Sequence, residues 1–150
     1  MRWLLTSLVV PVLVLGVFAK TTDEPLEALK ARAESARPQD QGPLLAAIAR
    51  REVTEADRFY TEGDIAKAKQ AVDDVVLYAR RATEAAQRSG KHLKNIEISL
   101  RETARRLDDV RKTLSFEDRP YVEAAVKQVE SSRQELLERM FGPQSKASKN

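Results

Sequence analysis

Apolar residues recur at alternating steps of three and four along most of the chain, and this spacing predicts a succession of helices. Residues at these steps share one helix face and form the seam along which helices pack in bundles and coiled coils. The pattern defines five helical segments, at 25–36, 43–62, 65–89, 91–114 and 119–141. No run alternates apolar and polar residues at a period of two, so we expect no strand.

Residues that favour helix ends separate these segments and set the expected domain organisation. Pro38 ends the first helix before a linker at 39–42, and Gly63 supplies the positive φ that often closes a helix. Asp64 and Asp118 are expected to cap the helices that follow them by accepting backbone N–H bonds. Short connections make consecutive helices antiparallel. We therefore expect an all-α fold: a short helix and linker at 20–42, an antiparallel helical bundle of four long helices at 43–142, and a disordered tail at 143–150.

The seams differ in the size of their residues, which predicts how the helices pack. The seam of 65–89 consists mostly of small residues: Ile65, Ala68, Val72, Val75, Ala79, Ala82 and Ala86. Small side chains let another backbone approach closely, so we expect this helix to lie centrally. The seam of 91–114 carries larger residues that would face those alanines: Leu93, Ile96, Leu100, Thr103, Leu107, Val110 and Leu114.

The segment at 1–19 has a different character. Arg2 precedes an apolar run at 3–18, and the small residues Val17 and Ala19 suit cleavage after Ala19. This order predicts a secretory signal peptide at 1–19 and a periplasmic or secreted protein. The alternative is an uncleaved inner-membrane anchor formed by 3–18: the run is shorter than the roughly 20 residues that span a bilayer, but Lys20 would snorkel to the interface.

The stretch 56–75 resembles the middle of a tetratricopeptide (TPR) repeat. That repeat places a small residue, an aromatic residue three positions on, a Gly-Asp turn, and an alanine five positions after the glycine. Ala56, Phe59, Gly63 with Asp64, and Ala68 occupy these positions. The resemblance implies a TPR-like helical hairpin without a peptide groove, because an array needs about three repeats to form one. Beyond this stretch the chain looks like the small exported helical proteins of bacteria.

Composition narrows the chemistry that the chain supports. Among its 150 residues there is no cysteine and one histidine, His92, which excludes thiol chemistry, cysteine-bound metals and paired histidine ligands. The sequence has no glycine-rich phosphate loop and no G-x-S-x-G or H-E-x-x-H motif. A net charge of +3, from 26 basic and 23 acidic residues, demands no nucleic-acid partner. We therefore expect a protein that is not an enzyme, with no catalytic residues, metal or cofactor.

Charged residues along the helices predict surface pairs more than sites. Asp73-Asp74 and Asp108-Asp109 are neighbours, and adjacent helix positions point about 100° apart, so neither pair is expected to converge on one ion. Opposite charges four positions apart predict weak pairs on a solvated face: Glu97–Arg101, Glu102–Arg106, Arg105–Asp109 and Asp108–Lys112.

Two features are candidate interaction sites. The first is a basic cluster that would meet anionic lipid, an anionic polymer or an acidic partner: Arg88, Lys91, His92 and Lys94, with Arg80 and Arg81 a few turns earlier. The second is Leu137 and Phe141, which lie off the main seam of the last helix and would accept a partner helix or a second copy of the chain. The continuous seam at 91–114 is a further source of such a surface. We expect helix-mediated protein–protein interaction, with binding to an anionic envelope surface as the alternative.

Overall fold

The computed structural model describes residues 24–142, and within this range the chain is all-helical with no strand. The helices are α1 (Leu26–Ser35), α2 (Pro38–Glu62), α3 (Ile65–Ser89), α4 (Leu93–Thr113) and α5 (Arg119–Phe141). The prediction of an all-α chain is confirmed for these residues. Three predicted segments lie outside the described residues: the signal peptide at 1–19, the alternative anchor at 3–18 and the tail at 143–150.

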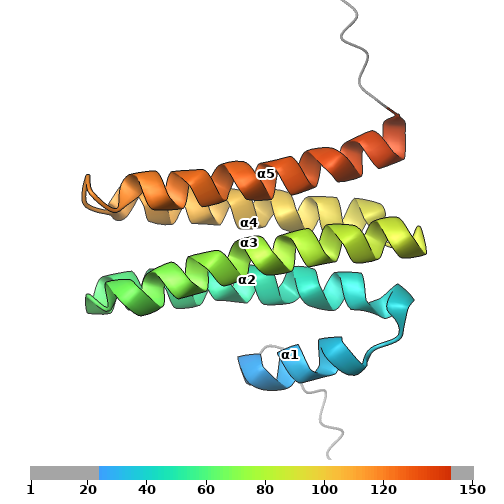
Figure 1. Cartoon of the computed structure of the whole chain (residues 1–150), viewed down its shortest axis with the longest axis horizontal. Helices are drawn as coiled ribbons and strands as arrows, with labels where there is room; N and C mark the ends of the chain where they lie inside the picture. The colour runs from blue at the N-terminus through green and yellow to red at the C-terminus, as the bar shows by residue number, and fades with distance from the viewer. Residues whose placement is uncertain (1–23, 143–150) are drawn as a thin grey trace, which may run out of the picture.

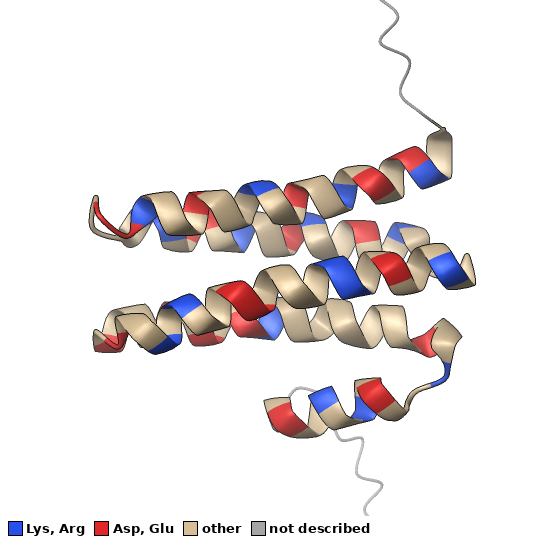
Figure 2. Cartoon of the chain, viewed as in Figure 1, with Lys and Arg blue, Asp and Glu red and all other residues tan. Residues whose placement is uncertain are grey.

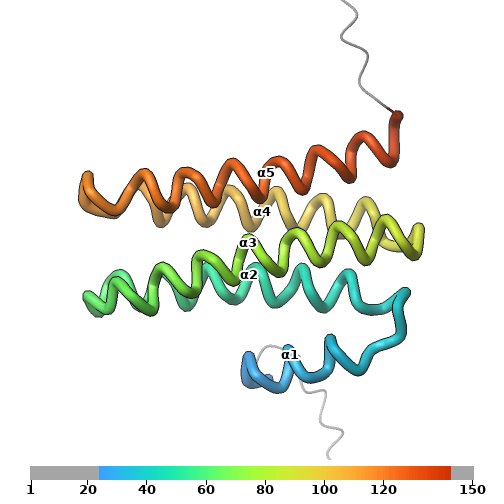
Figure 3. Tube along the Cα trace, viewed as in Figure 1, coloured from blue at the N-terminus to red at the C-terminus, as the bar shows by residue number. Residues whose placement is uncertain are grey.

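The four long helices lie side by side, and each runs opposite to the one before it (Figure 1). α2 contacts α3 and α4, and α5 contacts α4 and α3, so the four helices enclose one core. α1 lies outside this group and packs on α2, as the trace also shows (Figure 3). One end of the molecule therefore holds the α1–α2 and α3–α4 turns and the end of α5, and the other holds the α2–α3 and α4–α5 turns (Figure 1).

Local sequence explains why α2 and α3 meet in a tight turn. Gly63 adopts φ 79°, and its N–H donates to the Tyr60 carbonyl at 3.1 Å, which closes α2. Asp64 then caps α3, because its side chain accepts from the Lys67 N–H at 3.2 Å. Both predicted roles are confirmed. Asp118 is different: it precedes α5, but it makes no side-chain cap bond, and its carboxylate accepts from the Ser115 hydroxyl at 3.0 Å. The predicted capping role of Asp118 is therefore wrong.

The predicted linker at 39–42 is also wrong, because α2 begins at Pro38. A proline at the first helical position loses nothing, since N–H groups of the first turn have no partner within the helix. Pro43 lies inside the helix and removes one further N–H. Gly42 is buried, and a Cβ built on it would lie 2.6 Å from Cδ1 of Ile96. A side chain at position 42 would therefore displace the end of the Ile96 side chain on α4.

The core is aliphatic and follows the predicted seams closely. Ala49, Ala56, Ala79 and Ala82 are fully buried, and larger side chains from the other helices fill the space beside them: Leu45, Ile48, Ile96, Leu100, Leu107 and Leu136. α3 contacts α2, α4 and α5, which agrees with its predicted central position. Ile65 is the exception on its seam, since it is 36% exposed at the start of α3.

Candidate functional site

A buried ion pair joins α1 to the rest of the molecule. Nζ of Lys30 on α1 lies 2.8 Å from Oε1 of Glu52 on α2, and the Glu52 side chain is only 4% exposed. Lys30 also reaches Asp74 on α3 at 3.7 Å and lies 5.6 Å from the centre of the Tyr78 ring. Leu29 and Ala33 of α1 are also buried, so α1 docks through both apolar and charged contacts.

Each partner shifts the pKa of the other. Burial raises the pKa of Glu52 above its ordinary value, and the hydrogen bond from Lys30 only partly offsets this. Burial opposes the charge on Lys30, but the hydrogen bond and the charge of Glu52 outweigh burial and raise its pKa. The two charges lie 2.8 Å apart, so the pair joins α1 to α2 mainly by electrostatic attraction.

Sequence reasoning missed this pair, although one signal for Glu52 was present. Glu52 stands three positions after Ala49 and four before Ala56, so it occupies the buried face of its own helix. A charged residue on an apolar seam needs a partner from elsewhere, because a buried charge is costly unless it is paired. Nothing in the sequence identifies Lys30 as that partner.

The neighbouring acidic residues do not converge on one site. Asp73 accepts a 2.6 Å hydrogen bond from the Tyr121 hydroxyl on α5, whereas Asp74 faces Lys30 on α1. Asp108 pairs with Lys112 at 3.0 Å, as predicted from their spacing. Within residues 24–142, no group of three or more potential metal ligands comes together.

Two other predicted surface pairs are replaced by pairs between helices. Glu97 is paired with Arg133 on α5 at 2.6 Å instead of with Arg101, and its side chain is only 8% exposed. Glu102 lies 3.9 Å from Arg50 on α2 instead of pairing with Arg106. The spacing rule considers one helix alone, so it does not register a partner that packing brings from another helix.

The basic cluster Arg88, Lys91, His92 and Lys94 lies around the turn between α3 and α4. All four residues are exposed, and none forms an ion pair with another residue in the range 24–142. His92 adopts φ 61° and precedes α4 without a side-chain cap bond. The wider cluster is not assembled, because Arg80 lies 3.9 Å from Glu84 and Arg81 lies 2.6 Å from Glu34.

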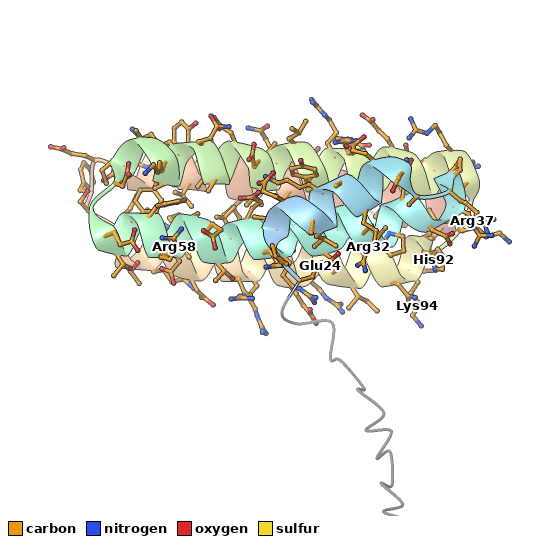
Figure 4. All side chains as sticks on the ribbon, turned by 90° about the horizontal axis from the view of Figure 1, so that it is seen from below. Glu24, Arg32, Arg37, Arg58, His92 and Lys94 are labelled. Carbon is orange, nitrogen blue, oxygen red and sulfur yellow. The ribbon has the colours of Figure 1, made fainter. Side chains whose placement is uncertain are left out.

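The fold adds one residue to this end that sequence proximity did not reveal. Arg37, in the α1–α2 turn, borders a hollow of about 450 Å³ together with Lys91 and Ser89. Figure 4 shows Arg37, His92 and Lys94 at the same end of the molecule. Arg37 is paired with Asp40 at 2.8 Å, so it contributes less free charge than the four residues of the cluster.

Leu137 and Phe141 lie at this same end. Leu137 is half-buried and Phe141 is 73% exposed, and their spacing of four places both on one side of α5. The Arg133–Glu97 pair sets the antiparallel register of α5 and α4, which puts Leu137 opposite the first turn of α4. The two predicted sites, distant in sequence, are thus brought together at one end (Figure 1).

The seam of α4 does not provide the second apolar surface that its continuity predicted. Ile96, Leu100 and Leu107 are at most 1% exposed, so these residues pack inside the core and leave no apolar surface for a partner. The prediction that this helix offers an unpacked stripe is therefore wrong. A long apolar seam indicates packing, but it does not tell whether the partner lies inside or outside the same chain.

Comparison with known proteins identifies no relative: no family model, curated protein or solved structure matches the chain. None of the helices within residues 24–142 is long and apolar enough to cross a membrane. Any assignment of function therefore depends on the geometry of the surface and on the N-terminal sequence.

Proposed function

We propose that the chain is an exported, non-enzymatic helical protein that binds a protein partner through the end that carries Leu137, Phe141 and the basic cluster. The observation that carries this proposal is the exposure of Phe141, 73%, at the same end of the molecule as the exposed residues Arg88, Lys91, His92 and Lys94. Burial of an aromatic side chain in a partner's pocket supplies much of the affinity of an interface. The basic residues at this end would select a partner that also carries acidic residues.

The chemistry favours an amphipathic helix as the partner. Leu137 and Phe141 present two apolar contacts one helical turn apart, which matches how helices pack on one another. A partner helix with apolar residues at the same spacing and acidic flanks would satisfy both features. Self-association through this end is the other outcome, and light scattering of the purified chain distinguishes it from a foreign partner.

The remaining parts of the chain have supporting roles in this proposal. The four long helices act as a self-standing antiparallel bundle that holds the binding end rigid. The α2–α3 hairpin, whose turn carries the TPR-like residues, is a structural element of this bundle with no peptide groove. The signal peptide at 1–19 directs export, with cleavage after Ala19, and an uncleaved anchor at 3–18 would instead hold the protein at the inner membrane. The mass of the protein recovered from cells distinguishes these two forms.

A photo-crosslinking amino acid at position 141 tests the proposed partner site in intact cells. Phe116 is a matched control, because it is 84% exposed but lies in the α4–α5 turn at the opposite end. We expect position 141 to capture a defined partner that position 116 does not capture, and Phe141→Asp to abolish its recovery. Equal capture at both positions, or none, would contradict the proposal.

Binding to an anionic envelope surface is a second candidate, favoured by the lack of ion pairs at the basic cluster within the described residues. Three unpaired cations, Arg88, Lys91 and Lys94, attract an anionic surface with about 1 kcal/mol each, and salt screens this attraction. Flotation with anionic vesicles at low and high salt tests it. Retention at low salt that is lost in the Arg88→Gln/Lys91→Gln/Lys94→Gln variant would support this candidate, and retention unaffected by the variant would exclude it.

A further inference from the structure

A second basic surface, away from the cluster at the α3–α4 turn, lies where α1, α2 and α4 meet. Four arginines line a cavity of about 420 Å³ there: Arg32 from α1, Arg50 and Arg51 from α2, and Arg106 from α4. Arg106 stands more than fifty positions after Arg50 and Arg51, and Arg32 stands eighteen positions before Arg50. The fold alone therefore assembles this group.

Parallel packing of α2 and α4 fixes two of the arginines. Arg50 lies 3.9 Å from Glu102, and Nη2 of Arg106 donates to the Thr54 hydroxyl at 3.3 Å. Both contacts join residues 52 positions apart, so they report one register between the two helices. Arg106 is therefore directed across the groove toward α2.

Glu24 orients the other two arginines at the start of α1. Its carboxylate lies 3.1 Å from Nη2 of Arg32, and its backbone carbonyl accepts a hydrogen bond from Nη1 of Arg51. Each of the four guanidinium groups thus has a hydrogen bond or ion pair that leaves other N–H groups of the fork available. Each guanidinium carries five N–H donors, and these contacts use few of them.

The charge of the cavity is strongly unbalanced. Its lining contains four arginines and one carboxylate, Glu24, which is a formal excess of +3, and counting Glu102 at the rim leaves +2. The Arg50–Glu102 pair is long, and both side chains are about half exposed, so it neutralises little charge. Clustered cations repel one another, and a bound anion relieves that repulsion.

The opposite side of α1 carries an excess of acidic residues, in contrast to the cavity lined by the four arginines. The hollow between α1, α2 and α3 has a volume of about 240 Å³ and is lined by four carboxylates and two lysines. The carboxylates are Glu27, Glu52, Glu55 and Asp74. Figure 2 shows that α1 carries both acidic and basic residues, and residues of α1 line both hollows. An anion is therefore attracted to one side of α1 and repelled from the other.

We propose that the cavity formed by Arg32, Arg50, Arg51 and Arg106 is a binding site for a phosphate monoester. The planar guanidinium fork matches two phosphate oxygens at once, which a lysine cannot do. The cavity is in the size range of small-molecule sites, so it takes a phosphate group together with part of the molecule that carries it. The apolar side chains of Leu29 and Ala47 line the same cavity and would contact that attached part.

The experiment uses the purified full chain with three probes: inorganic phosphate, glycerol 3-phosphate, and vesicles that contain phosphatidic acid. Calorimetry or a thermal unfolding shift measures binding at matched ionic strength, with chloride as the reference anion. We expect glycerol 3-phosphate to bind more tightly than inorganic phosphate. Binding of the vesicles with no binding of glycerol 3-phosphate would identify a lipid head group as the source of the phosphate.

Arg50→Gln/Arg106→Gln is the decisive variant, and Arg105→Gln is its matched control. Arg105 is exposed on the same helix, next to Arg106, and does not line the cavity. Each lost charge-assisted contact weakens binding by about tenfold or more, so we expect about a hundredfold loss in the double variant and no loss in the control. Arg50→Lys/Arg106→Lys keeps the charge without the fork, and we expect its affinity to lie between those of the Gln double variant and the control.

Circular dichroism of each variant shows whether it is folded before binding is measured. If the Gln variant does not fold, the Lys variant decides, because it keeps every charge. Equal binding by the parent, the double variant and the control would overturn the proposal. Absence of binding by the parent to all three probes would overturn it as well, whatever the outcome at Phe141 or at the basic cluster.

Discussion

Replacement of Lys30 by methionine tests how α1 is held, because it removes the cation of the buried pair and leaves the carboxylate. Methionine keeps most of the aliphatic stem of lysine, so the change is mainly one of charge. In Lys30→Met, Glu52 keeps its buried position, with a side chain that is 4% exposed, and loses the ammonium group 2.8 Å away. The expected result is a large loss of stability.

The size of that loss follows from the burial of the two partners. Removal of one partner from a buried pair typically costs about 3–5 kcal/mol. The Lys30 side chain is 21% exposed, so water reaches the site and the lower end of that range, about 3 kcal/mol, applies. Glu52→Met costs less, about 1–2 kcal/mol, because Lys30 keeps Asp74 and solvent as partners. The double variant places two apolar side chains together and should lie within about 1 kcal/mol of the parent.

Urea unfolding of the parent, both single variants and the double variant gives the coupling between the two residues. A coupling of about 3–5 kcal/mol supports the assignment, and additive effects would refute it. Arg58→Met is the control, because Arg58 pairs with Glu55 and Glu62 on the exposed surface of α2. A surface pair contributes little, so this variant should unfold almost as the parent does.

The pH dependence of Lys30→Met provides an independent check. Burial raises the pKa of Glu52, and without Lys30 nothing offsets that rise. A carboxyl whose pKa is higher in the folded state adds stability below its unfolded pKa and loses it as pH rises through the folded value. Lys30→Met should therefore approach the parent in stability in acid and fall behind at neutral pH. A difference that is constant with pH would mean that the buried charge is not the cause.

Three further predictions concern other parts of the chain. Gly42→Ala should cost about 1 kcal/mol of stability in the parent, because the added Cβ meets Cδ1 of Ile96. The same change should stabilise the Ile96→Val variant, in which that atom is absent and only the gain in helix propensity is left. Urea unfolding measures both changes in stability. Burial raises the pKa of Tyr60 to about 12, and the hydrogen bond from its hydroxyl raises that of Tyr121 to about 12, so tyrosinate absorbance should develop near pH 12 in the folded chain. The stability of the fold should decrease as pH rises from 10 to 12, because these tyrosines ionise at lower pH in the unfolded chain. Ionisation of Tyr60 and Tyr121 near pH 10 in the folded chain would contradict this prediction. Asp64→Ala should lower the midpoint of thermal unfolding, and the difference should shrink as pH falls through the lowered pKa of that carboxyl.

Helix positions and seams were accessible to sequence reasoning because they depend on residues close together in the chain. The Gly63–Asp64 turn is decided by a positive φ and a cap bond within four residues, and the structure has both. The start of α2 was misplaced because Pro38, Gly42 and Pro43 together favour a break when they are judged locally. In the structure Gly42 is buried inside α2 against Ile96 of α4. This contact involves a residue more than fifty positions away, so a local pattern does not predict it.

The charged contacts between helices were not accessible in the same way. Glu52 and Glu97 each had a position on or near a buried face that indicated a need for a partner. Their partners, Lys30 and Arg133, look like ordinary surface residues in the sequence. A spacing rule finds pairs within a helix, whereas these pairs depend on which helices become neighbours and in which register.

The distribution of charge over the folded molecule was likewise not predictable from the sequence. With 26 basic and 23 acidic residues, composition gives no reason to expect an anionic ligand. The fold separates these charges: an excess of acid lies between α1, α2 and α3, and an excess of arginine lies between α1, α2 and α4. Affinity for an anion depends on the local field within about one Debye length, roughly 8 Å at physiological salt, and not on the total charge. A near-neutral chain is therefore compatible with a strongly basic site, and raising the salt concentration should weaken anion binding at that site more than it changes the stability of the core.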